Sequence, residues 1–151
     1  MKKTIMIILF FLTTSSVNAS VAYMETKTIS VKIENIKTER GGQLIVFVFT
    51  SLGFPKQHDH ALMKFIELVE HSKVQMEIQV PANQNFSLKV LHDENMDGKV
   101  TKNWTGIIPK DGLGFSNGAR IRFGPPSFDD AKIRYAEELA PIIPLHYDVF
   151  R

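Results

Sequence analysis

The chain has 151 residues, with 18 Lys and Arg, 16 Asp and Glu, and no cysteine. The lack of cysteine excludes disulfides, thiol catalysis, zinc–thiolate sites and iron–sulfur clusters. The length predicts one domain, and it is sufficient for an ordinary hydrophobic core.

The N-terminus has the order of a secretory signal peptide. A basic start, Met1-Lys2-Lys3, precedes the apolar run 5–12 and a stretch of small residues. The run is too short to span a bilayer, which needs about 20 residues. We therefore expect residues 1–19 to be a signal peptide, cleaved after Ala19 or after Ala22. The mature protein would then have no stable membrane insertion and would be exported to the periplasm or the outside of a bacterial cell.

Cleavage changes the charge balance of the domain. Loss of Lys2 and Lys3 lowers the count of Lys and Arg from 18 to 16, which equals the 16 Asp and Glu. The mature domain, residues 20–151, is then formally neutral. A neutral domain gives no electrostatic reason to expect nucleic acid or an anionic membrane as its partner.

The first two predicted strands differ in pattern. Residues 27–36 alternate apolar and polar side chains, as in a half-buried strand. Residues 43–50 are almost wholly apolar, as in a strand covered on both faces. Gly41 and Gly42 can form a tight turn between them. The sequence therefore predicts that the two strands pair as an antiparallel hairpin.

Two further strands are predicted over residues 74–80 and 86–91, with a turn at 81–85. The second leads directly into a polar stretch at Asp93. Alternation predicts one buried face for each strand, formed by Val74, Met76, Ile78 and Val80 and by Phe86, Leu88 and Val90.

The remaining segments are less regular. Residues 61–71 fit either a short helix or a strand over 65–69. Short strands are expected at 119–123 and 132–135. A final strand over 139–149 contains two prolines, which favours an edge position. Short strands divided by turns predict an all-β fold, an antiparallel β-sandwich with one long Asp/Gly-rich loop.

That loop contains a pattern typical of calcium sites. Asp93, Asn95 and Asp97 stand at alternate positions, followed by Gly98 and Lys99. Ca²⁺ binds six to eight oxygens, and such spacing brings side-chain oxygens and the Lys99 carbonyl toward one point.

The pattern departs from an EF-hand at its twelfth position, which is Trp104 instead of a bidentate glutamate. Asp111 is the best candidate for the missing ligand, with Asp129 and Asp130 next. The alternative is a loop held by Asp and Asn side chains without metal, because these residues are also common in turns. Calcium is the one cofactor that the sequence suggests.

Histidines offer two other sites. His58 and His60, at i and i+2, can chelate a transition metal, although a solvated loop is the favoured interpretation. His92 beside Asp93 or Asp111 can act as a general base in a hydrolase. Ser116 lies in a tight turn, but without a demonstrated base we interpret it as a turn hydroxyl. We assign no catalytic residue.

Two aromatic residues flank the glycine-rich part of the loop. Trp104 and Phe115 either anchor the loop or, with His92, form a surface that binds a ligand or partner. The identity of that ligand does not follow from the sequence.

The order of several motifs resembles the bacterial DUF2141 family. They are His92-Asp93-Glu94-Asn95, Asp97-Gly98-Lys99, Gly106-Ile107, Gly114-Phe115-Ser116-Asn117, Gly124-Pro125-Pro126-Ser127-Phe128 and Asp130-Ala131. The resemblance covers essentially the whole mature chain. It implies an immunoglobulin-like or transthyretin-like sandwich, a signal peptide and no known reaction. The chain departs from the family at 81–86, where a Pro-Gly turn and a Tyr are usual, and at Asp111, where Glu is frequent.

The sequence thus favours an exported, non-enzymatic binding or structural module that binds Ca²⁺ through the 93–117 loop. The alternatives are a periplasmic hydrolase that uses His92 and nearby carboxylates, and a histidine-based transition-metal scavenger.

Overall fold

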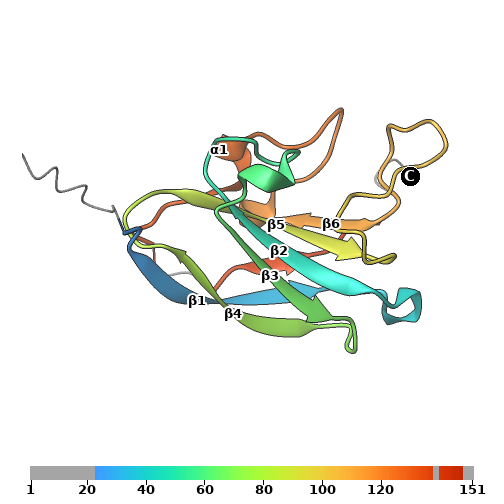
Figure 1. The fold of residues 1–151 in the computed structure, drawn as a ribbon, viewed down its shortest axis with the longest axis horizontal. Coiled ribbons are helices and arrows are strands. Elements are labelled where there is room, and N and C mark those ends of the chain that lie inside the picture. The colour runs from blue at the N-terminus through green and yellow to red at the C-terminus, as the bar shows by residue number, and fades with distance from the viewer. Residues whose placement is uncertain (1–22, 138–139, 148–151) are drawn as a thin grey trace, which may run out of the picture.

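The computed structural model describes residues 23–137 and 140–147, and it arranges them as two β-sheets with almost no helix (Figure 1). The three-stranded sheet has the order β4 (Val74–Pro81), β1 (Thr26–Glu34), β8 (Ile142–Pro144). The five-stranded sheet contains β3 (Met63–Leu68), β2 (Gln43–Phe49), β5 (Phe86–Asp93) and β6 (Gly112–Phe115), with β7 (Lys132–Ile133) paired to β5.

The prediction of an all-β sandwich is confirmed, whereas its immunoglobulin-like or transthyretin-like type stays a prediction. The signal peptide lies outside the described residues. No helix within them is long and apolar enough to cross a membrane. The single α-helix in the described part of the chain, α1 (Phe128–Ala131), has four residues.

The predicted hairpin of the first two strands is wrong. β1 pairs with β4 and β8, whereas β2 pairs with β3 and β5 in the other sheet. The physical reason lies in their different patterns. β1 buries Val31 and Ile33 on one face only, but the side chains of β2 are buried on both faces. A strand of the second kind belongs inside a sheet that is covered on both sides.

The space between the sheets holds the larger apolar core. The predicted inward faces of β4 and β5 are confirmed, because all seven of their apolar residues are buried there. Val31, Ile33, Ile143 and Leu145 complete this core from the three-stranded side.

A second apolar cluster covers the other face of the five-stranded sheet. It contains Ile45, Phe47, Phe49, Leu91, Leu113, Phe115 and Ala131. Loop residues pack on it, among them Phe54, Val100 and Ile121. Strand β5 therefore has no solvated face, and the polar side chains on its outer side are enclosed by loops.

Several local predictions changed in the structure. Residues 61–71 adopt the strand alternative, β3, and the final strand is short and lies at a sheet edge. The predicted strand at 119–123 is irregular loop. Strand β6 and helix α1 were not predicted. Helix α1 begins with a capping box in which Ser127 and Asp130 bond each other's backbone N–H groups.

Candidate functional site

A row of side chains crosses the outer face of the five-stranded sheet. Lys64 on β3, Phe47 on β2, Lys89 on β5 and Phe115 on β6 are neighbours in the strand registers. Lys64 and Lys89 place their ammonium groups 5.7 and 5.9 Å from the centre of the Phe47 ring. Lys64 is exposed, whereas only 4% of Lys89 is accessible to solvent.

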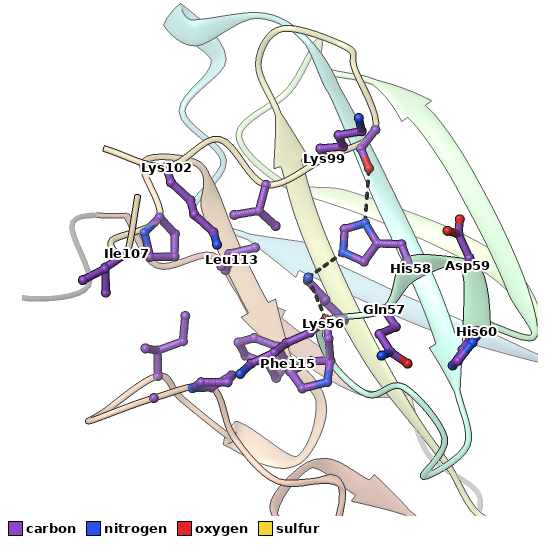
Figure 2. Close-up of a pocket in the computed structure, with 18 of the residues that line it drawn as sticks. Lys56, Gln57, His58, Asp59, His60, Lys99, Lys102, Ile107, Leu113 and Phe115 are labelled. Atoms are coloured by element: carbon purple, nitrogen blue, oxygen red, sulfur yellow. Dashed lines mark hydrogen bonds between the residues drawn. The ribbon is translucent and has the colours of Figure 1, made fainter. Parts of the chain in front are cut away.

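Three members of this row, Lys64, Lys89 and Phe115, form the floor of an open groove of about 1140 Å³, which the surrounding loops enclose (Figure 2). Its walls are formed by residues 55–60, by residues of the 97–109 loop and by residues of the 121–125 loop. Lys64, Lys89, Leu113 and Phe115 line it from the strands. We refer to this space as the groove.

Lys89 is held at the groove by two acceptors. Its Nζ donates to the Pro55 carbonyl at 2.9 Å and lies 2.7 Å from Nε2 of His58. Burial lowers the pKa of Lys89 to about 7. Near neutral pH this amine therefore exists in comparable amounts with and without its proton.

His58 joins Lys89 to the polar loop. Its ring stacks on Phe47, with ring centres 4.1 Å apart, and its Nδ1 lies 3.2 Å from the Gly98 carbonyl. A carbonyl accepts only, so Nδ1 carries the proton and Nε2 accepts from Lys89. Burial, with the nearby Lys89 charge as the second cause, lowers the pKa of His58 to about 4, so the ring is neutral at pH 7.

The predicted metal ligands organise the 93–111 loop through N–H donors. Asp93 is buried, and its carboxylate accepts from the N–H groups of Asp97 and Gly98 and from the Gln43 amide. Asp97, which is exposed, accepts from the Lys99 N–H and the Asn95 amide. These two bonds lower the pKa of Asp97.

Asp111 closes the other end of this loop. It is buried, and its carboxylate accepts the Thr101 N–H at 2.6 Å. Burial raises the pKa of Asp111, and the Thr101 bond opposes that shift in part. Among residues 23–137 and 140–147, no three His, Asp or Glu side chains are grouped as a metal site. Calcium binding by this loop stays a prediction, and the loop's own hydrogen bonds provide the alternative scaffold.

The structure does not bring His92, Trp104 and Phe115 together as one surface. His92 is fully buried between the sheets, with Nδ1 at 2.6 Å from the Tyr147 hydroxyl and Nε2 at 2.6 Å from the Gly41 carbonyl. Phe115 is buried on the opposite face of the same sheet, whereas 95% of Trp104 is exposed. His92 and Asp93 are consecutive in β5, so their side chains point to opposite faces.

The other sequence candidates also have defined places. His58 and His60 lie in a 3-10 turn, but both nitrogens of His58 already have partners. His58 would have to leave Lys89 or Gly98 to bind a metal. Ser116 is fully buried, where its hydroxyl accepts the Leu88 N–H and donates to the Ala131 carbonyl. It is therefore a structural hydroxyl in this fold.

A model of a family described as uncharacterised proteins conserved in bacteria, DUF2141, matches residues 31–142. The chain belongs to this family. No curated protein and no solved structure matches the chain. The matched region of this DUF2141 protein includes all the residues that line the groove.

Lys89 is the site residue that sequence reasoning missed in this DUF2141 protein. In the segment FSLKVL, alternation places Lys89 opposite the buried Phe86, Leu88 and Val90, which is the usual position of a solvated lysine. Loops that are distant in sequence cover that face, and the alternation within the strand cannot indicate such cover. The apolar neighbour Leu91, on the same face as Lys89, was the one available sign of cover.

Proposed function

We propose that this DUF2141 protein is an exported, non-enzymatic binding module that holds a small anionic ligand, a phosphate or a carboxylate, in the groove. The observation that carries the proposal is the position of Lys89. A buried amine on the groove floor is desolvated, so an anion that reaches it meets a donor without competing water.

The donor geometry of Lys89 supports this role. A protonated amine has three N–H donors. Pro55 and His58 are its two acceptors among the described residues, which leaves one donor for a ligand in the groove. The neutral His58 adds no positive charge of its own, but it fixes the direction of the Lys89 amine.

The rest of the groove lining is also cationic. Four further lysines line it, against two aspartates. The lysines are Lys56, Lys64, Lys99 and Lys102, and the aspartates are Asp59 and Asp97. The neutral mature domain thus concentrates positive charge at one place, which favours the entry of anions.

Calorimetric titration of inorganic phosphate into the purified protein tests the proposal. Because the pKa of Lys89 is about 7, binding should be tighter at pH 6 than at pH 9. Lys89→Met should abolish binding at both pH values. Lys64→Met removes an exposed lysine from the same row and should weaken binding only slightly. Equal binding by wild type and Lys89→Met would refute the proposal.

A further inference from the structure

Large apolar side chains stand exposed at the rim of the groove. Ile107 is 74% exposed and Phe123 is fully exposed, and both residues line the groove. Trp104, 95% exposed, belongs to the same turn as Ile107, which a bridge between Lys102 and Pro109 closes. Single exposed apolar residues are ordinary, but three on two loops beside one groove indicate a surface that meets an apolar partner.

Basic residues accompany these three side chains. Lys99 and Lys102 line the groove on the same loop as Ile107. Lys110 is exposed at the end of that loop, and Arg122 is exposed next to Phe123. An apolar tip surrounded by cations matches the boundary of an anionic bilayer, where aromatic rings sit at headgroup depth and Lys and Arg contact phosphates.

We propose that Trp104, Ile107 and Phe123 dock this protein on the surface of a membrane that contains anionic lipid, with a lipid phosphate entering the groove. The entry of a lipid phosphate into the groove rests on the proposed anion-binding function. The exposed side chains of Trp104, Ile107 and Phe123, which we call the apolar tips, are an independent feature. Docking at the surface needs no membrane-spanning segment. The neutral total charge does not oppose it, because the cations are gathered at the groove and its rim.

The only tryptophan of the chain reports directly on this surface, because it is Trp104. We expect its emission to shift to shorter wavelength with vesicles of phosphatidylglycerol and phosphatidylcholine, and the protein to sediment with them. Pure phosphatidylcholine vesicles should give neither effect. High salt should reverse the binding, since it screens the cation–phosphate contacts.

Two variants test whether the apolar tips bind the vesicles more strongly than other exposed apolar side chains do. Phe123→Ser should weaken binding to the anionic vesicles by about tenfold, the loss expected when one large apolar side chain no longer enters the interface. Ile142→Ser is the matched control, because Ile142 is 57% exposed on the three-stranded sheet. It should bind the vesicles as wild type does.

Three outcomes would overturn the proposal. They are absence of vesicle binding, equal binding to both vesicle types, and a dimer whose Trp104 emission is already shifted without vesicles, which would mean that a second copy covers the tips. Phosphate binding that persists in any of these cases would leave the anion-binding function standing. If Lys89→Met bound the vesicles as tightly as wild type, docking would not involve a lipid phosphate in the groove.

Discussion

Replacement of Lys89 by methionine should change how the stability of the protein depends on pH. The pKa of Lys89 is about 7 in the folded protein, against an ordinary value of 10.5. Between these values the unfolded chain holds a proton that the folded protein has released. The free energy of unfolding therefore rises with pH across this window, and the full cost of burying the charge is present below pH 7.

One proton of difference corresponds to a slope of about 1.4 kcal/mol per pH unit. Methionine keeps the apolar stem and removes the titrating group, so Lys89→Met should lack this slope. The stability of wild type relative to the variant should then increase by about 2–3 kcal/mol between pH 7.5 and 9.5. Lost hydrogen bonds to Pro55 and His58 change the offset between the two curves but not their slopes.

Urea unfolding at several pH values measures this difference. Titrations common to both proteins cancel in the comparison, and His58, whose pKa is about 4, lies outside the window. Lys64→Met is the control, and its curve should run parallel to wild type. Parallel curves for wild type and Lys89→Met would refute the burial of a titrating amine at this position.

Three further predictions concern the scaffold of the site. Ser116→Ala leaves two buried backbone partners without their bond and should lower the free energy of unfolding by about 2–4 kcal/mol; urea unfolding measures it, and a loss under 1 kcal/mol would contradict the assignment. Asp93→Ala should lower Tm equally with EDTA and with Ca²⁺, because the Asp93 carboxylate bonds N–H groups of the loop; a loss seen only with Ca²⁺ would instead establish the calcium site. Gly114→Ala should lower Tm strongly, because its Cβ would lie 2.6 Å from an Ile143 methyl, while the matched Gly124→Ala meets open space and should not.

Strand identity was predictable where alternation extends over seven residues, as in 74–80, but not in the short alternating segment 119–123, which is loop. Residues 74–80 show a period of two, and the structure buries that face between the sheets. Which strands pair with each other was harder to predict from the sequence, as β1 and β2 show. They are neighbours in sequence but lie in different sheets, because partner choice depends on which faces the rest of the chain covers.

The candidate site shows the same limit. The polar pattern of the 93–111 loop was visible, and its Asp side chains do organise that loop. The pattern could not show that Lys89 would be enclosed, because its partners Pro55 and His58 lie 34 and 31 positions away in the sequence. For His92 the sequence suggested a closeness that the structure does not have. His92 and Asp93 are neighbours in the sequence, but their side chains lie on opposite faces of the sheet.

The most direct test of the central claim is an NMR titration of the Lys89 side chain with inorganic phosphate at pH 6.5. We expect the Lys89 Cε–H signals to move in a saturable manner. Repeated over a series of pH values, the measurement should show that phosphate raises the Lys89 pKa from about 7, because it stabilises the charged amine. This is the result that anion binding at Lys89 requires. Lys89 signals that stay in place while the exposed lysines respond weakly and without saturation would contradict it.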